Sequence, residues 1–252
     1  MERILVTDLD GTFVGDDAAM HALWSELDHS GVVLVFASGR HLDSIETFYA
    51  ATDAAHGAAR RAEACICMIG TEIWELGPNG YVSTAEWSLA IAAGWDVSVV
   101  DAAALTLDGL EAQAPEWQSE WKRSYLVPAG AAATVAALAV AVRAAGVDAK
   151  VVHSVDRYVD VIPGRAGKGE AARYLAARRG SGSADVVTCG DSGNDLDMMR
   201  PELGFRSIVV GNAAAEMASL HGDHVYRAER PYAAGIREGL VHFGWLTAAP
   251  SL

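Results

Sequence analysis

Two aspartates, Asp8 and Asp10, directly follow a short apolar run at residues 4–6. The run is typical of a buried strand, and Gly11 then interrupts it with a residue that is free to adopt positive φ. The two carboxylates are therefore expected at the carboxyl end of a strand, at the sheet edge where open α/β proteins bind their ligands. Because like charges at this distance repel each other, the pair requires a cation, a proton or a phosphate-binding neighbour. Taken alone, the pattern also fits an Asp-Gly turn followed by a helix cap.

Three further segments place polar groups after apolar runs. A Ser-Gly-Arg segment at residues 38–40 follows one such run, and Gly-Asp-Ser-Gly-Asn-Asp at residues 190–195 follows another. Between them, Lys168 lies in a glycine-rich segment that is expected to open a helix. Since the carboxyl ends of parallel strands meet at one edge of a sheet, these segments are expected to come together.

The combined set contains three or four carboxylates, one hydroxyl with adjacent backbone N–H groups, and one lysine. Carboxylate oxygens suit Mg²⁺, and a hydroxyl and a lysine beside the metal suit the oxygens of a transferring phosphoryl group. Each member also has a purely structural interpretation. Ser38 and Asp191 are suited to turns or helix caps, and Lys168 to a solvated first turn. The segment around Lys168 is no P-loop, because Gly169 follows the lysine and the first glycine is not correctly spaced.

The overall composition limits the class of protein. With 252 residues, 51% of them hydrophobic, the chain can form one large domain or two moderate ones. The formal net charge of −14 argues against a nucleic-acid or anionic-membrane surface, but a bound metal could still attract a small phosphorylated substrate. Cys65, Cys67 and Cys189 do not suggest a disulfide framework. With neither a leader nor a membrane span apparent, a cytoplasmic protein is expected, and the oligomeric state is open.

Strand and helix patterns alternate along most of the chain, which predicts a parallel sheet with helices on both faces. The core is expected at residues 1–78 and 161–252, and an inserted α+β module at residues 79–160. Strands are expected at residues 32–37, 64–69, 122–127, 149–153, 158–162, 185–189 and 207–210. Helices are expected from residue 16 to residue 29, at residues 42–55, 130–145 and 195–199, and after residues 167, 212 and 233. A hairpin is expected to turn at Gly77-Pro78-Asn79-Gly80.

The four segments, in this order, resemble the motifs of the haloacid-dehalogenase-like phosphatases. They are Asp8-Leu9-Asp10-Gly11-Thr12, Ser38-Gly39-Arg40, Lys168 and Gly190-Asp191-Ser192-Gly193-Asn194-Asp195. The resemblance implies a Rossmann-like core, and the position of the insert resembles a type-C2 cap. Within that superfamily, four segments look like the sucrose-phosphate phosphatase group, which includes mannosylfructose-phosphate phosphatase. They are Phe13-Val14-Gly15-Asp16, Ile69-Gly70-Thr71-Glu72-Ile73, Asp160-Val161-Ile162-Pro163 and Val209-Val210-Gly211-Asn212-Ala213.

The resemblance implies an Mg²⁺-dependent phosphatase that works through an aspartyl-phosphate. Asp8 would be the nucleophile, and Asp10 would protonate the leaving oxygen and then activate water. Mg²⁺ would be held by the Asp8 carboxylate, the Asp10 main-chain carbonyl and Asp191, with Asp195 close behind. The residues expected to bind or position the phosphoryl group are Ser38, Gly39, Arg40, Lys168 and Asn194.

The cap is expected to close over a sugar and exclude water. The candidate sugar contacts are Thr71, Glu72, Trp117, Lys122 and Arg123, although ordinary packing also explains the tryptophan. Lys122 lies in a Lys-Ser-Tyr segment comparable to one in the resembled group. Sucrose 6-phosphate or mannosylfructose phosphate is the expected substrate, with glucosylglycerol phosphate or mannosylglycerate phosphate as alternatives. A phosphosugar mutase and a phosphorylatable receiver-type switch are the competing functions.

Overall fold

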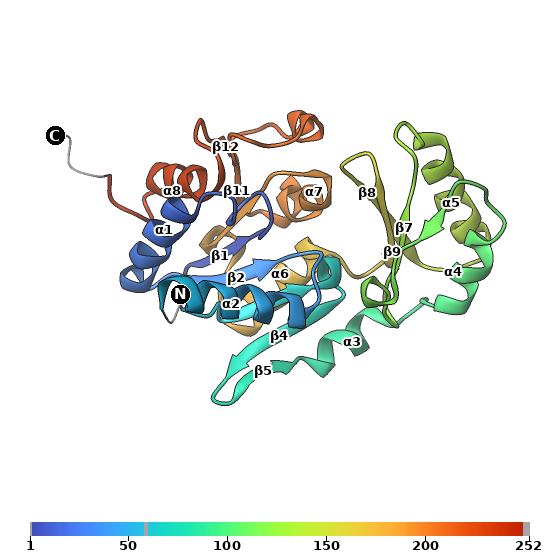
Figure 1. Cartoon of the computed structure of the whole chain (residues 1–252), viewed down its shortest axis with the longest axis horizontal. Helices are drawn as coiled ribbons and strands as arrows, with labels where there is room; N and C mark the ends of the chain where they lie inside the picture. The colour runs from blue at the N-terminus through green and yellow to red at the C-terminus, as the bar shows by residue number, and fades with distance from the viewer. Residues whose placement is uncertain (1, 58–59, 249–252) are drawn as a thin grey trace.

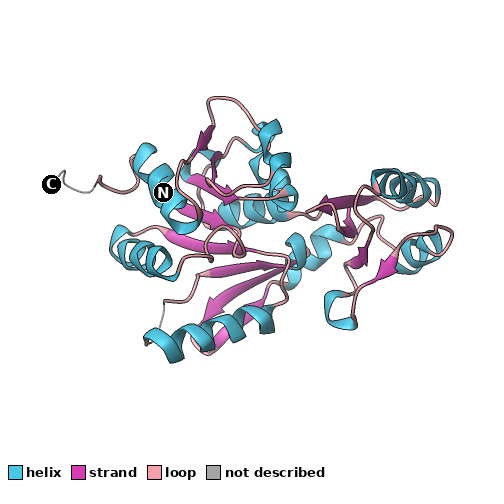
Figure 2. Ribbon diagram, turned by 45° about the horizontal axis from the view of Figure 1, so that its top comes forward, coloured by secondary structure: helices cyan, strands magenta, loops and turns pink. Residues whose placement is uncertain are grey.

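The chain forms two lobes, each built on its own β-sheet (Figure 1). This computed structural model describes residues 2–57 and 60–248. The larger lobe contains an eight-stranded sheet in the order β12-β11-β10-β1-β2-β3-β4-β5, and the smaller lobe a four-stranded sheet in the order β6-β7-β9-β8. Figure 2 shows that the connecting segments run between one end of the large sheet and the small lobe. The smaller lobe is called the cap below.

The strands from β12 to β3 are parallel, whereas β4 and β5 form an antiparallel hairpin at one edge of the core sheet. The core strands are β1 (Ile4–Thr7), β2 (Val33–Ala37), β3 (Ala64–Cys67), β4 (Glu72–Gly77), β5 (Gly80–Ser83), β10 (Val186–Gly190), β11 (Arg206–Val209) and β12 (Val225–Arg227). The predicted parallel α/β core is therefore confirmed. The hairpin predicted at residues 77–80 is confirmed as well.

Helices cover both faces of the core sheet. Alternate residues of β1 point to opposite faces, so Leu5 packs in one hydrophobic cluster and Ile4 and Val6 in another. The first cluster is covered by α1 (Asp17–Ser30), α2 (Leu42–His56) and α8 (Tyr232–His242). The second is covered by α3 (Ala85–Ile91), α6 (Lys168–Arg178) and α7 (Leu196–Met199). Burial on both faces explains why the central strands β1, β2 and β3 are nearly continuous apolar runs.

The cap has its own hydrophobic core. Its strands are β6 (Glu111–Ala112), β7 (Arg123–Leu126), β8 (Ala149–Ser154) and β9 (Tyr158–Pro163), and its helices are α4 (Val97–Ala104) and α5 (Ala132–Ala144). Val159 and Val161 of β9 are buried against Leu138 and Val142 of α5 and Val100 of α4. The cap sheet is thus covered by helices on one face.

The structure differs from the sequence expectations in several places. β5 pairs with β4 in the core sheet, although residues from 79 onward were expected in the insert. Likewise, the cap strand β9 continues to Pro163, past the expected boundary at residue 160. Turn residues predict a hairpin, but they do not indicate which sheet it joins.

The helices also differ from the sequence expectations. The helix expected after Asn212 is a 3₁₀ segment, Ala215–Ser219, and neither α3 nor α4 was predicted. None of the helices in the described ranges is long and apolar enough to cross a membrane.

Candidate active site

Three neighbouring strands of the core sheet end at the same cavity. Asp8 follows β1, Ser38 follows β2, and Asp191 follows β10, and these strands are adjacent in the order β10-β1-β2. All three residues line a cavity of about 660 Å³ that also has walls from the cap. The structure therefore brings together the residues that the strand-end pattern placed at one edge.

Lys168 is at the centre of a buried charge cluster. It is the first residue of α6, and its side chain is fully buried. Its Nζ donates to Oδ1 of Asp8 and of Asp195, each at 2.7 Å, and to Oδ1 of Asn194 at 3.1 Å. Burial raises the pKa of Asp8 well above its usual range, and Lys168 opposes that rise. Burial alone would lower the pKa of Lys168, but Asp195 and Asp8 raise it above its usual range. The ammonium is thus held in its charged form.

Three carboxylates are grouped closely enough to share a cation. Oxygen atoms of Asp8, Asp191 and Asp195 lie within 4.8 Å of one another. Burial, followed by the charge of Asp195, raises the pKa of Asp191 to about 6. Lys168 neutralises only one of the three negative charges, and the remaining excess together with the oxygen donors fits a divalent cation such as Mg²⁺.

Asp195 lies behind the other two carboxylates. Its Oδ1 accepts from Lys168, and its Oδ2 accepts the backbone N–H groups of Asp191 at 3.0 Å and Ser192 at 3.2 Å. Both oxygens of Asp195 therefore have protein partners. Asp191 has its Oδ1 fixed by the hydroxyl of Thr12 at 3.0 Å. Asp195 thus orients the loop and the lysine, while Asp8 and Asp191 are better placed to take a metal.

The turn after Asp8 requires glycine for two reasons. Gly11 has a φ of +79°, and a Cβ on it would lie 2.6 Å from Oδ2 of Asp191. The carbonyl of Gly11 also accepts a hydrogen bond from Nδ2 of Asn212 at 2.7 Å. The Gly11 backbone is therefore packed directly against the carboxylate group. Thr12 and Asn212 are contacts that the sequence interpretation did not single out as site residues, although both lie within the motifs quoted for the resemblance.

Ser38 and Arg40 lie on the opposite side of Asp8 from Asp191. Ser38 is almost fully buried, and its Oγ accepts the N–H of Arg40 at 3.2 Å. The Arg40 guanidinium binds the Asp10 carboxylate through two hydrogen bonds, Nε to Oδ2 at 2.7 Å and Nη2 to Oδ1 at 2.5 Å. The Asp10 side chain is 55% exposed, so this pair lies at the rim of the cavity, in contrast to the buried Asp8.

The cap supplies a buried ion pair to the cavity wall. Lys122 Nζ lies 3.3 Å from Oδ1 of Asp160, and both side chains are buried. Ser124 donates its hydroxyl to the same Asp160 oxygen, and the Trp117 ring centroid lies 5.9 Å from Nζ. The further cap residues that line the cavity are Gln113, Ser154, Val155 and Tyr158.

Asp160 was not among the predicted site residues, although its place in the sequence indicates that it faces the cavity. Asp160 is a charged residue inside the apolar strand β9, and its neighbours Val159 and Val161 point into the cap core. Alternation along a strand then places Asp160 on the face toward the cavity. The other cap residues that line the cavity carry no comparable signal.

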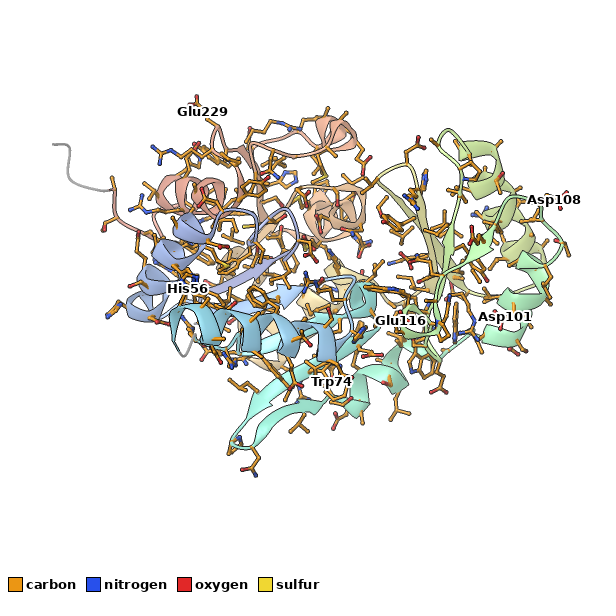
Figure 3. All side chains as sticks on the ribbon, in the orientation of Figure 1. His56, Trp74, Asp101, Asp108, Glu116 and Glu229 are labelled. Atoms are coloured by element: carbon orange, nitrogen blue, oxygen red, sulfur yellow. The ribbon has the colours of Figure 1, made fainter. Side chains whose placement is uncertain are left out.

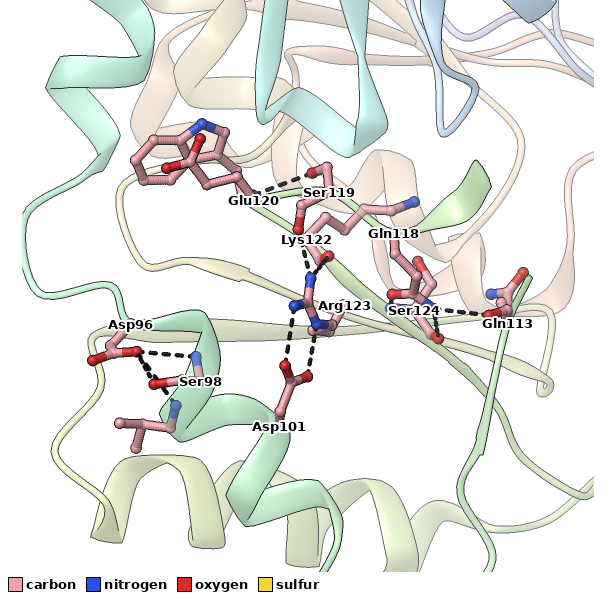
Figure 4. A network of polar contacts seen from close by, with 12 residues as sticks. Asp96, Ser98, Asp101, Gln113, Gln118, Ser119, Glu120, Lys122, Arg123 and Ser124 are labelled. Carbon is pink, nitrogen blue, oxygen red and sulfur yellow. Dashed lines mark hydrogen bonds and ion pairs between the residues drawn. The ribbon is translucent and has the colours of Figure 1, made fainter. Parts of the chain in front are cut away.

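Three of the expected sugar contacts are absent from this cavity. Arg123 follows Lys122 and points the opposite way, where it forms a two-bonded ion pair with Asp101 (Figure 4). Figure 3 shows Asp101 in the cap lobe. Thr71 donates to the Met68 carbonyl at 3.0 Å. Glu72 accepts from the Trp74 indole at 3.0 Å. The structure places none of these three in the cavity lining, because each is engaged elsewhere in its own lobe.

Comparisons with known proteins agree with this geometry. Residues 1–244 match the family described as sucrose-6F-phosphate phosphohydrolase. The mannosylfructose-phosphate phosphatase of Agrobacterium fabrum is 32% identical over 96% of this chain and 97% of its own length. The crystal structure of the sucrose-phosphatase of Synechocystis sp. in complex with sucrose and phosphate superposes with a TM-score of 0.87 at 28% identity, covering 98% of this chain and 100% of that one.

The same fold occurs in a haloacid-dehalogenase subclass IIB sugar phosphatase, which has a TM-score of 0.69 at 14% identity and covers 97% of this chain and 100% of its own. The family match covers both halves of the core and the cap between them. The chain therefore belongs to the sucrose-6F-phosphate phosphohydrolase family of haloacid-dehalogenase-type phosphatases and is a phosphoric monoester hydrolase.

Proposed function

We propose that this enzyme hydrolyses a disaccharide phosphate, either sucrose 6-phosphate or mannosylfructose phosphate. The observation that carries this proposal is the continuity of one cavity from the Asp8 cluster to the cap wall. Its volume of about 660 Å³ lies within the range of about 300–1,000 Å³ that is usual for small-molecule sites. The similarity to a mannosylfructose-phosphate phosphatase and a sucrose-phosphatase supports this class of substrate.

Asp8 is the nucleophile in this proposal. One of its oxygens is held by Lys168, and we assign its second oxygen the attack on phosphorus. The P–O bond to the sugar breaks, the phosphoryl group is transferred to Asp8, and water then hydrolyses the resulting aspartyl-phosphate. Ser38, the Gly39 N–H and Lys168 bind the phosphoryl oxygens, while Asn194 is fixed beside them by its contact with Lys168.

Asp10 moves protons in both steps. It protonates the leaving sugar oxygen and then takes a proton from the attacking water. Its exposed position at the rim of the cavity agrees with this role, because the leaving group must point from the phosphorus toward the cap. Arg40 holds the Asp10 carboxylate in place, so an ion pair takes the place of its expected contact with phosphate.

The carboxylate group fits Mg²⁺ as the metal. Asp8, the Asp10 main-chain carbonyl and Asp191 would hold it, with Asp195 behind them. Bound Mg²⁺ would reduce the repulsion between the Asp8 carboxylate and the anionic phosphate. The buried aspartates thus provide both the nucleophile and the site for the ion that makes the attack possible.

Lys122 and Trp117 are the cap residues that we propose as sugar contacts. The buried Lys122 ammonium has three N–H donors, and the single oxygen of Asp160 at 3.3 Å satisfies at most one of them. The remaining donors face a polar cavity, where sugar hydroxyls are suitable acceptors. Trp117 offers an aromatic face, and its ring lies 5.8 Å from that of His41 in the core. We propose that the enzyme acts in the cytoplasm, where its three buried, unpaired cysteines would remain reduced.

A phosphate-release assay tests this function. Sucrose 6-phosphate, mannosylfructose phosphate, glucosylglycerol phosphate and mannosylglycerate phosphate are each incubated with the enzyme in Mg²⁺ or in chelator. We expect the highest kcat/KM for one of the two disaccharide phosphates and no release in chelator. Faster hydrolysis of a glycerol-linked substrate would overturn the substrate assignment, and conversion to an isomer without phosphate release would indicate a mutase.

A further inference from the structure

The turn between β8 and β9 contains a residue that does not suit its conformation. Val155 and Asp156 both have positive φ, +53° and +50°, and the Arg157 N–H donates to the Ser154 carbonyl at 3.2 Å. This is the φ pattern of a type I′ turn, whose two central positions favour glycine, asparagine or aspartate. Asp156 meets that preference. Val155 does not, because a β-branched residue in the left-handed region is a genuine outlier.

Burial does not explain the valine. Val155 is 58% exposed, so packing offsets little of the cost of its backbone conformation. Glycine or asparagine would suit this position better on local grounds alone. Unfavourable backbone conformations of this kind are found at ligand sites, where a side chain is required for its contact with the ligand.

The turn is docked against the loop that holds the catalytic carboxylates. Oε1 of Glu216 accepts the N–H of Gly193 at 2.6 Å and lies 3.5 Å from the N–H of Val155. A Cβ on Gly193 would lie only 3.0 Å from the carbonyl oxygen of His153, at the end of β8. Glu216 therefore connects the tip of the cap hairpin to the loop of residues 191–195. Val155 lines the cavity that contains Asp8 and Asp191, whereas Asp156 does not.

We propose that Val155 is a specificity-determining residue whose side chain contacts an apolar C–H face of the sugar. This inference rests on the proposed function. Val155 reaches the cavity beside the carboxylate loop, and Trp117 reaches it beside the Ser38 loop, as its contact with His41 shows. These two cap side chains, together with Ile69 of the core, are apolar surfaces in a cavity that is otherwise lined mainly by charged, amide and hydroxyl groups. Sugar rings present both hydroxyl groups and apolar C–H groups. Val155 selects substrates whose ring places C–H groups against its side chain.

The variants Val155→Gly and Val155→Asn separate the backbone from the side chain. Asparagine and glycine both adopt the left-handed conformation with less strain than valine. The thermal unfolding midpoint is therefore expected to rise by about 2–4 °C in Val155→Asn. The rise is expected to be smaller in Val155→Gly, because glycine makes the unfolded chain more flexible. Because the valine methyl groups are lost, KM for the disaccharide phosphate is expected to rise about tenfold in Val155→Gly, with little change in kcat. Inhibition by inorganic phosphate is expected to stay unchanged, since the phosphoryl site is intact.

Asp156→Asn is the matched control, because it changes the neighbouring turn residue, which does not line the cavity. Asparagine can still accept the Gly130 N–H and tolerates positive φ, so both KM and the unfolding midpoint are expected to stay at the wild-type values. If the wild-type enzyme hydrolyses the disaccharide phosphate and Val155→Gly has the same KM as wild type, the specificity role of Val155 is overturned. A lower midpoint in Val155→Asn would show that the valine is not strained, which also overturns the proposal. Absence of wild-type turnover would instead refute the proposed function, and this inference with it.

Discussion

Replacing Lys168 with methionine tests the charge balance on which the site depends. The substitution keeps the length and apolar volume of the side chain but removes the ammonium that bonds to Asp8 and Asp195. All three side chains are buried, and removing one partner from a buried ion pair costs about 3–5 kcal/mol. We therefore expect Lys168→Met to lose about 3–5 kcal/mol of unfolding free energy in chelator, where no metal offsets the carboxylates.

The loss should depend on pH with a definite sign. Burial already raises the pKa of Asp8, and removing Lys168 removes the interaction that opposes this rise. The folded variant then binds more protons than the unfolded chain at mildly acidic pH, so its stability falls as pH rises. The difference from wild type is expected to be smaller at pH 5 than at pH 7.

Urea unfolding in chelator, followed by tryptophan fluorescence, measures these differences. Lys150→Met is the matched control, because the Lys150 side chain is partly exposed. Its Nζ lies 3.4 Å from Asp197 and donates to the Ala166 carbonyl at 2.7 Å, so its loss is expected to cost about 1–2 kcal/mol. Adding Asp8→Asn to Lys168→Met should restore stability, with a coupling energy of about 1–3 kcal/mol. A loss below about 1 kcal/mol in Lys168→Met, with no recovery in the double variant, would refute the reasoning.

Three further substitutions test separate parts of the site. Burial and Asp195 raise the pKa of Asp191 to about 6, which corresponds to about 3 kcal/mol at pH 7 before solvent screening of this partly exposed group reduces it. Asp191→Asn should therefore stabilise the metal-free enzyme by about 1–2 kcal/mol at pH 7. It should also abolish stabilisation by Mg²⁺ in thermal unfolding. Gly11→Ala should weaken Mg²⁺ binding in calorimetry by at least about tenfold, because its Cβ would lie 2.6 Å from Asp191 Oδ2; wild-type affinity would contradict the observed packing. Lys122→Met should lower kcat/KM for the disaccharide phosphate by about tenfold or more and leave inhibition by inorganic phosphate unchanged, whereas an equal loss of both would place Lys122 at the phosphoryl site.

Much of the core site could be predicted from the sequence because it depends on local rules. Each of Asp8, Ser38 and Asp191 directly follows an apolar strand, and parallel strands end at the same edge, so these positions were enough to predict a shared site. Lys168 could be recognised as a site residue because a lysine in the first turn of a helix is unfavourable against the helix dipole, which suggests a negatively charged partner outside the helix. Two buried carboxylates are those partners in the structure.

The cap was less predictable because its function depends on which face of each strand meets the core. Lys122 and Arg123 are adjacent in sequence, yet one lines the cavity and the other pairs with Asp101 on the opposite side. The Arg40–Asp10 pair and the contact between Glu216 and the β8–β9 turn likewise join segments that are far apart in the chain. No local propensity specifies such contacts. The Arg40–Asp10 pair follows from the pairing of β1 with β2 in the core sheet, and the Glu216 contact follows from the docking of the cap on the core.

The most direct test of the central claim is to look for a phosphoryl group on Asp8. Asp10→Asn is mixed with the disaccharide phosphate in Mg²⁺, quenched in acid, and digested for mass spectrometry of the peptide that contains Asp8. Asp10→Asn slows both steps, but it lacks the group that activates water, so we expect a fraction of this peptide to carry one phosphoryl group. We expect Asp8→Asn to release no phosphate. Phosphate release by Asp8→Asn at the wild-type rate, or a phosphoryl group on another residue, would contradict the account.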